Sequence, residues 1–547
     1  MHKIFFTPIS FICLVFSFFA CNTKKSADMI VHHALVYTVD SAFSTAEAFA
    51  VKDGKFIAIG SSEAILSTYE ASKVIDAGGA PVYPGFYDAH AHFFDLAGTL
   101  SEADLTGTQS FEEIIERLQA FRKANPDFVW LKGNGWDQND WENKRFPDRK
   151  DLDAVFPDVP VYLTRVDGHA AIANTKALEL AGITKAQKVE GGLMVTENGR
   201  LTGVLVDNAQ GLVRRHIPEP SREDMETRLL MAQDSCLSVG LTTLADAGLG
   251  IQEIDLLQKM YADSTLKIRD YAMVAYSKKN AEEFLKRGTY TSDKLNVRSF
   301  KLMSDGALGS RGACMLEPYS DANTHGFLLL SPDALDTAVA TLAKSNFQAN
   351  THAIGDSANR IMLDLYGKYL KGKNDRRWRI EHAQIIAPED FKKFAAYDII
   401  PSVQPTHATS DMYWAGDRIG AERLKGAYAY QDLLDTNGKL ALGSDFPVEH
   451  FNPLYGFHAA VARVDAQGYP EGGFQMENAI SREDALRGMT IWAAYACFEE
   501  NTHGSIEAGK AADFVVLEAD IMQVPDEALR DVKVSKTVVG GELVYAR

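Results

Sequence analysis

The sequence predicts an α/β protein built around a (β/α)8 barrel of the TIM type, with a small composite β-sandwich formed by both chain ends. Eight short apolar runs that have the character of strands alternate with amphipathic helical stretches through the middle of the chain. Both ends are rich in short strands and turns. No Gly-rich phosphate loop follows the first strand of the alternating region, which disfavours the competing doubly wound open sheet.

The two chain ends have the pattern of one β domain. Residues 28–83 contain alternating apolar runs, and Asp53-Gly54 between two of these runs is a strong hairpin signal. Residues 505–547 show the same pattern and contain a second turn at Gly540-Gly541. We therefore expect residues 28–83 and 505–547 to form the composite β-sandwich, and residues 84–504 to form the barrel.

The barrel prediction depends on the number and order of the apolar runs. Helical stretches such as residues 221–240 and 331–345 separate most of them. A closed barrel needs eight strands and gathers their C-terminal ends at one face, where active sites lie. The predicted strands are residues 81–89, 241–247, 267–276, 297–305, 347–353, 376–383, 399–407 and 439–445.

An insertion from about residue 100 to 215 interrupts the alternation between the first two predicted strands. It contains a hairpin-like segment over residues 191–209. Loops at the C-terminal ends of barrel strands build the substrate pocket. We interpret the insertion as a subdomain on the substrate side of the barrel and not as an independent functional module.

The N-terminus has the pattern of an exported lipoprotein. Residues 1–20 carry a lysine near the start and an apolar stretch too short for a comfortable membrane span. Ala20-Cys21 resembles a lipoprotein cleavage site, although Phe18-Phe19 departs from its usual aliphatic pattern. We expect residues 21–27 to be a polar tether on lipid-modified Cys21, in the periplasm or at the outer membrane of a bacterium. Ordinary signal cleavage and an uncleaved anchor are the alternatives.

Composition indicates a large globular protein. The chain has 547 residues, of which 46% are hydrophobic, and a formal net charge of -18. The acidic balance argues against nucleic acid as a partner, because nucleic acid binding needs a basic surface. Three cysteines lie beyond Cys21 and form no CxxC pair, so we expect no disulfide framework.

Six residues at or near the C-terminal ends of predicted strands have the chemistry of a metal site. Neutral imidazoles and carboxylates suit Zn²⁺ and similar ions. His90 and His92 are two positions apart, so both side chains project from the same face of a strand. Taken singly, His352 and His382 are more often structural residues, so the prediction depends on the whole set. The six are His90, His92, Lys301, His352, His382 and Asp445.

Two of the six residues allow different interpretations. Lys301 alternates with Ser299 and would point into the barrel, where an uncompensated cation is costly. It either pairs with a neighbouring acid, such as Asp305, or forms a carbamate with CO₂, which would make it an anionic oxygen ligand. Asp445 is either a turn or helix-cap residue before Pro447 or a carboxylate that takes a proton during catalysis.

The set resembles the amidohydrolase superfamily, and within it the amidohydrolase 3 branch that includes N-substituted formamide deformylase-like proteins. The matching stretches span residues 30–547 and include VYPGFYDAHAHF, RVDGHAAIANTKAL, KLMSDGALGSRGA, THAIGD, RIEHAQ and GSDFPVE. The resemblance implies a β/α barrel with a composite β-sandwich. It also implies ligands after strands one, four, five, six and eight.

The resemblance implies roles for these residues. One metal would be held by His90, His92 and Asp445. A second would be held by His352 and His382, with carboxylated Lys301 between the two ions. One ion held by a subset of the ligands is the alternative. The metal is expected to be divalent, with Zn²⁺ first.

Metal-activated water would attack the substrate, and Asp445 would pass its proton to the leaving nitrogen. His169 and His407 are candidates for polarising or orienting the substrate. We therefore predict a metal-dependent hydrolase of a non-peptide carbon–nitrogen bond in a small amide, formamide or cyclic amide. A deaminase of a nitrogen heterocycle on the same scaffold is the alternative enzyme. The alternative of another class is a non-catalytic binding lipoprotein.

Overall fold

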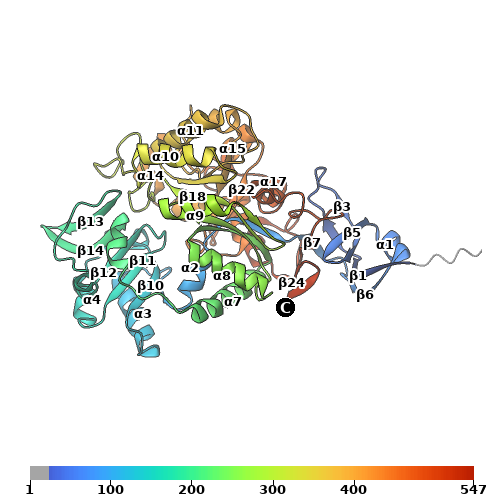
Figure 1. The fold of residues 1–547 in the computed structure, drawn as a ribbon, viewed down its shortest axis with the longest axis horizontal. Coiled ribbons are helices and arrows are strands. Elements are labelled where there is room, and N and C mark those ends of the chain that lie inside the picture. The colour runs from blue at the N-terminus through green and yellow to red at the C-terminus, as the bar shows by residue number, and fades with distance from the viewer. Residues whose placement is uncertain (1–23) are drawn as a thin grey trace, which may run out of the picture.

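A computed structural model describes residues 24–547. A central barrel lies between two smaller bodies, one at each end of the long axis of the molecule (Figure 1). The small β domain lies at one end and the insertion at the other (Figure 1). Cys21 and the predicted signal peptide lie outside the described residues. Within residues 24–547, no helix combines the length and the apolar character that a membrane span requires.

The small β domain contains two sheets. The first consists of N-terminal strands only, in the order β5 (Lys55–Gly60), β4 (Ala48–Lys52), β1 (Lys25–His32) and β6 (Tyr69–Asp76), with α1 (Ser62–Thr68) beside it. The second combines both chain ends, in the order β25 (Glu542–Ala546), β24 (Val534–Val539), β23 (Phe514–Leu517), β7 (Pro81–Pro84), β2 (Leu35–Tyr37) and β3 (Thr45–Ala46). The rings of Phe49, Phe56 and Phe514 pack in the core between them.

The predicted tether is partly wrong, because β1 begins at Lys25. Ser26 and Ala27 pair with Glu70 and Ala71 of β6, and the side chain of Ala27 is buried. Backbone pairing and apolar burial therefore hold residues 25–27 in the first sheet, so only the residues before them remain for a tether.

The barrel contains eight parallel strands, which confirms the predicted fold class. Each barrel strand after the first pairs with the barrel strand that precedes it in the sequence. One further short strand, β17 (Tyr290–Thr291), is not part of this order and pairs antiparallel with β18 (Leu295–Met303). Backbone hydrogen bonds join the last strand region to the first, from Asp445 N to His90 O (2.8 Å) and from His92 N to Phe446 O (2.8 Å). The strands are β8 (Phe86–Ala91), β15 (Leu241–Leu249), β16 (Arg269–Ala275), β18 (Leu295–Met303), β19 (Gln348–Ala353), β20 (Arg379–His382), β21 (Ile400–Val403) and β22 (Ala441–Leu442).

The first predicted strand, residues 81–89, is divided at Gly85. Residues before Gly85 form β7 of the small β domain, and residues after it form β8 of the barrel. Gly85 N donates to Asp513 O (2.9 Å), whereas Phe86 N donates to Gly240 O (3.1 Å). The chain therefore changes its hydrogen-bonding partner at this residue, which an apolar run in a sequence does not reveal.

Helices surround the barrel, and several begin at a serine whose side chain accepts a backbone hydrogen bond, as N-caps do. Examples are Ser221, Ser277 and Ser331. Outside the insertion, the helices between the first and the fifth barrel strand are α2 (Phe93–Thr99), α7 (Arg222–Ser238), α8 (Ile251–Ala262), α9 (Lys278–Arg287) and α10 (Pro332–Ala343). The later ones are α11 (Asp356–Leu370), α12 (Phe391–Ala396), α13 (Pro405–Asp411), α14 (Ala415–Leu424), α15 (Tyr430–Asn437), α16 (Pro453–Ala462), α17 (Arg482–Gly488) and α18 (Ile491–Ala496).

The insertion has its own sheet and its own core. Trp136 and Trp141 pack within that core, with ring centroids 6.1 Å apart. The hairpin expected at residues 191–209 forms β13 and β14. The sheet order is β13 (Gly192–Glu197), β14 (Arg200–Asp207), β12 (Ala170–Ala173), β11 (Val161–Arg165), β10 (Leu131–Trp136) and β9 (Ala103–Asp104), with helices α3 (Phe111–Ala124), α4 (Lys150–Val155), α5 (Thr175–Leu180) and α6 (Gly211–Arg214).

Candidate active site

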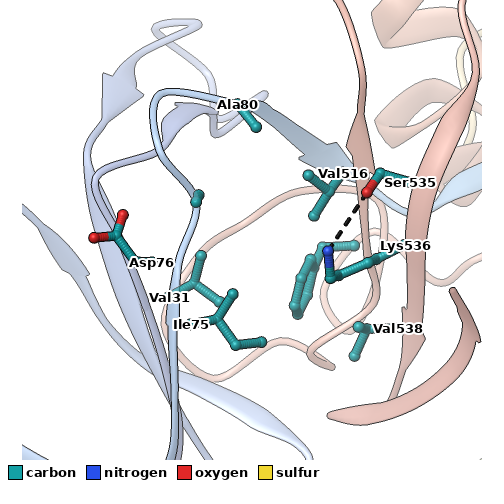
Figure 2. A pocket seen from close by; sticks show the side chains of 10 residues that line it. Val31, Ile75, Asp76, Ala80, Val516, Ser535, Lys536 and Val538 are labelled. Carbon is teal, nitrogen blue, oxygen red and sulfur yellow. Dashed lines mark hydrogen bonds between the residues drawn. The ribbon is translucent and has the colours of Figure 1, made fainter. Parts of the chain in front are cut away.

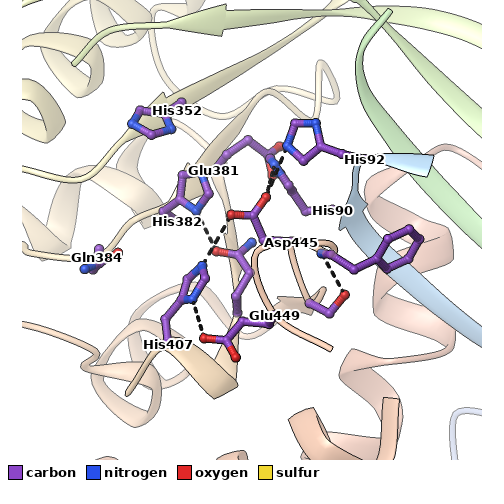
Figure 3. Close-up of polar contacts among 12 residues, drawn as sticks. His90, His92, His352, Glu381, His382, Gln384, His407, Asp445 and Glu449 are labelled. Atoms are coloured by element: carbon purple, nitrogen blue, oxygen red, sulfur yellow. Dashed lines mark hydrogen bonds and ion pairs between the residues drawn. The ribbon is translucent and has the colours of Figure 1, made fainter. Parts of the chain in front are cut away.

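One group of possible metal ligands joins the first and last barrel strands. His90, His92 and Asp445 each offer an atom, and these atoms lie within 4.8 Å of one another. Asp445 Oδ1 is 3.4 Å from His90 Nε2 and 3.2 Å from His92 Nε2. Figure 3 shows the three side chains converging from their strands. The distances follow from the backbone bonds between these strands, which place the two ends side by side.

A buried ion pair between Arg379 and Glu381 orients His90. Its Nδ1 lies 2.5 Å from Glu381 Oε2, and Arg379 donates to both carboxylate oxygens of Glu381 (2.6 and 2.9 Å). Although burial alone would raise it, Arg379 and His90 hold the pKa of Glu381 well below its usual range. Because Nδ1–H donates to Glu381, the Nε2 lone pair of His90 faces the candidate site, as in a ligating histidine whose second nitrogen is hydrogen-bonded.

Lys301 points into the barrel mouth, as its alternation on the strand predicts. Its Nζ lies 2.9 Å from His90 Nε2, and its side chain is buried. Burial lowers the pKa of this amine. The described residues contain no ion pair between Lys301 and Asp305, whose carboxylate accepts backbone N–H groups of Cys314, Ile354 and Gly355. The expectation of a salt bridge between Lys301 and Asp305 is therefore wrong.

His352 and His382 form the next part of the site. Their ring centroids are 4.6 Å apart, and His382 Nδ1 lies 2.7 Å from Gln404 Oε1. This contact assigns the Nδ1 proton to the hydrogen bond and leaves Nε2 of His382 free. Burial lowers the pKa of both imidazoles well below the usual value. Both rings are therefore neutral, the form that binds metal.

The structure groups His382 differently from the pairing that the resemblance implies. The second group of mutually close ligand atoms is His382, His407 and Asp445, and His352 belongs to neither group. His407 nevertheless has both ring nitrogens beside carboxylates, with Nε2 3.4 Å from Asp445 Oδ2 and Nδ1 3.1 Å from Glu449 Oε1. These contacts allow His407 to donate hydrogen bonds to both carboxylates.

The charge states of His407 and Asp445 support that interpretation. Burial alone would lower the pKa of His407, but its contacts with Asp445 and Glu449 raise it well above the usual value. Burial alone would raise the pKa of Asp445, but hydrogen bonds with His407 and His92 hold it well below the usual range. Asp445 is therefore an ionised carboxylate beside a protonated imidazole. Its side chain caps no helix. Asp445 does begin a turn through Pro447, because its backbone carbonyl accepts from Val448 N (2.9 Å), while its carboxylate faces the imidazoles.

His169 reaches the site from the insertion. Its ring centroid is 5.0 Å from that of His352, and its Nδ1 lies 2.6 Å from Asp207 Oδ1. Burial alone would lower the pKa of His169, but Asp207 raises it to about 9. The insertion thus places a protonated imidazole beside the barrel ligands. Gly306 and Gly312 of the barrel leave space for Asp207, since a Cβ on either would lie 2.5 Å from Asp207 Oδ2.

The candidate residues from the sequence all gather at this face of the barrel, but their partners did not stand out in the sequence. The alternation within RIEHAQ places Arg379 and Glu381 on the same face of one strand, which is a usable signal for a buried ion pair. Asp207 and Glu449 are isolated acidic residues in the sequence with no such pattern. The residues that sequence reasoning missed are Arg379, Glu381, Gln404, Glu449 and Asp207.

The donor set fits a divalent metal. His90, His352 and His382 are neutral imidazoles, and Asp445 is ionised. Imidazole and carboxylate donors are those used in catalytic zinc sites, and other first-row divalent ions accept them too. The residues that would hold the metal are His90, His92, His382 and Asp445, with Lys301 and His352 beside them.

The chain is similar to known hydrolases over nearly its full length. A model described as Amidohydrolase family matches residues 73–545. The putative amidohydrolase YtcJ of Bacillus subtilis is 30% identical, over 95% of this chain and 99% of that protein. The N-substituted formamide deformylase of Arthrobacter pascens is 26% identical, over 95% and 98%. An uncharacterized metal-dependent hydrolase from Pyrococcus horikoshii has a TM-score of 0.74 at 27% identity, over 91% and 99%.

We predict that Gln404→Leu weakens metal binding by about 10–100-fold, the usual cost of losing a hydrogen bond that orients a ligand. The variant removes the acceptor of His382 Nδ1–H and introduces no charge. Competition with a coloured chelator measures the affinity. Gln252→Leu, on the exposed side of α8, is the matched control. Equal affinity in the two variants would show that His382 does not bind the metal.

Proposed function

Since the chain belongs to the amidohydrolase family, we propose that it hydrolyses a non-peptide carbon–nitrogen bond of a small amide, formamide or cyclic amide, using Zn²⁺. Membership confirms the resemblance inferred from the motifs. The observation that carries the proposal is the ionised Asp445 between the imidazoles of His90, His92 and His407. The activity named for the formamide deformylase relative supports the type of bond.

The metal, when bound, supplies a Lewis acid that activates water and polarises the substrate carbonyl. Asp445 takes the proton of the attacking water at a carboxylate oxygen and gives it to the leaving nitrogen. The protonated His407 holds Asp445 Oδ2 in place (3.4 Å). The protonated His169 donates a hydrogen bond to the substrate oxygen, where negative charge develops.

A hydrolysis screen with the metal-replete protein tests the proposed function. N-formyl amines, N-acyl amines and cyclic amides should yield a carboxylate and an amine, or the ring-opened product. Release of ammonia from nitrogen heterocycles, without amide hydrolysis, would instead support the deaminase alternative. Tight binding of such compounds without any turnover would support a binding lipoprotein.

Asp445→Asn should keep the shape of the side chain but cannot accept a proton. We expect kcat to fall at least about a hundredfold, within the usual range for loss of a general base, in protein whose metal content has been restored. Metal analysis of each preparation supplies the control. A kcat near that of the unmodified protein at equal metal content would assign proton transfer to another residue.

Asp207→Asn should change the pH dependence of kcat. His169 has a pKa of about 9 because of Asp207. A step that needs the His169 proton therefore runs fully below that pH, and kcat falls as pH rises through it, which gives the pH profile an alkaline limb. Removing the carboxylate charge should move this alkaline limb to lower pH by about one unit or more. Asp127→Asn, at an exposed position of the insertion, should leave the limb in place. An unmoved limb in Asp207→Asn would assign it to another group.

Lys301 is proposed to carry a carbamate. The neutral amine attacks the carbon of CO₂, so that an N–C bond forms while one C=O π bond breaks onto oxygen. One N–H proton then leaves, and the product is an anionic carbamate. Burial, which lowers the pKa of Lys301, favours the neutral amine. Lys301→Ala should lose metal and activity, with partial recovery in short carboxylic acids, whereas Lys344→Ala, an exposed control, should lose neither. Mass measurement showing unmodified Lys301 in active, fully metallated protein would overturn the assignment.

Lipid anchoring at Cys21 is proposed from the N-terminal sequence alone. Mass spectrometry of the mature N-terminus, prepared from the native host, should find an acylated cysteine at this position. Cys21→Ser should abolish the modification and release the protein from membrane fractions. An unmodified N-terminus further along the chain would show ordinary signal cleavage.

A further inference from the structure

We propose that the small β domain contains a second metal site, built from His32, His33 and Asp76, for a divalent cation that prefers nitrogen ligands, such as Zn²⁺. One ligand atom from each of the three side chains lies within 4.8 Å of the other two. The site belongs to the first sheet of the β domain, which lies at the end of the molecule opposite the insertion (Figure 1). It is therefore separate from the barrel ligands.

The strand register brings the ligands together. β1 and β6 run parallel, and His32 at the end of β1 lies opposite Asp76 at the end of β6. His33 follows directly, and its Nδ1 lies 3.1 Å from Asp76 Oδ2. Two segments that are 43 residues apart in sequence thus present their side chains at the same edge.

The backbone at His33 explains why two consecutive histidines can face one ion. Neighbouring residues of a strand point to opposite faces, but His33 has φ of 50°, which ends the alternation. Its ring centroid lies 4.5 Å from that of His32. Hydrogen bonds from His33 N to Ser62 Oγ (2.9 Å) and from Gly79 N to His33 O (2.6 Å) fix this conformation.

Free donor atoms remain at the site. His32 Nδ1 is buried and has no hydrogen-bond partner among the described residues. Asp76 Oδ1 accepts from Gly78 N (2.9 Å), which orients Oδ2 toward His33. Figure 2 shows the Asp76 carboxylate directed away from the neighbouring cavity, whereas Val31 and Ile75 point into it. The apolar side chains therefore face the cavity, and the candidate ligands lie on the side that faces away from it.

The chemistry of the three donors selects the ion. Two imidazole nitrogens and one carboxylate oxygen make a ligand set known from zinc sites, with a fourth position left for water. Mg²⁺ and Ca²⁺ prefer sites composed of oxygen ligands. The side chains of His33 and Asp76 are 59% and 58% exposed, so an ion can enter directly from solvent. Once bound, it would connect the ends of β1 and β6.

Calorimetric titration of the full mature protein, with its barrel site already loaded, tests the proposal. The unmodified protein should bind one further Zn²⁺ and should not bind Mg²⁺ there. His33→Asn should weaken this binding at least about tenfold, since it removes a ligand and not merely a group that orients one. Asparagine also tolerates a positive φ, so the backbone should be retained. His216→Ala, which removes an exposed histidine elsewhere, is the control and should bind as before.

Three further measurements make the result decisive. Asp76→Asn keeps the acceptor of Gly78 N–H but removes the charge, and it should also weaken the additional binding. Excess Zn²⁺ should raise the unfolding temperature of the unmodified protein more than that of either variant, because a ligand stabilises the state that binds it. Hydrolysis should be unchanged in both variants. No additional Zn²⁺ in the unmodified protein, or equal additional binding in His33→Asn, would overturn the proposal.

Discussion

The closure of the barrel is the constraint on which the rest of the structure depends. Asp445 N donates to His90 O, and the Asp88 carboxylate accepts from the hydroxyl of Ser444 (2.6 Å). These bonds join residues more than 350 positions apart, as the separation of 356 for Asp88 and Ser444 shows. Gly443 makes the close approach possible, because a Cβ there would lie 2.5 Å from His90 N. The candidate metal ligands are therefore placed by backbone pairing before any metal binds.

Buried charge is the second determinant of the site. Arg379, Glu381 and His90 are almost completely excluded from solvent, and each satisfies the next through a hydrogen bond. Breaking such a pair by removing one partner typically costs about 3–5 kcal/mol. The chain of charges thus fixes the tautomer of His90, and it also makes the barrel interior intolerant of changes that leave Arg379 unpaired.

Much of this arrangement could be predicted from the sequence, because parallel strands of a barrel share one functional face. His90, Lys301, His382 and Asp445 stand at or near strand ends, so the topology alone brings them together. Their partners could not be found in this way. The contact between His90 and Glu381 spans 291 residues, and it depends on the exact register of strands that an apolar pattern locates only approximately. Likewise, two adjacent histidines in a sequence do not predict the positive φ of His33.

The site is shared between two separately packed cores. The candidate metal ligands belong to the barrel, whereas His169 and Asp207 belong to the insertion, which packs around its own tryptophans. Gly306 and Gly312 of the barrel form the seat for Asp207. Under the proposed function, metal content would report that the barrel has folded, and turnover would report that the insertion has also docked. An insertion exchanged with that of a relative would leave metal content unchanged. It would leave turnover unchanged only if the incoming segment fits against Gly306 and Gly312.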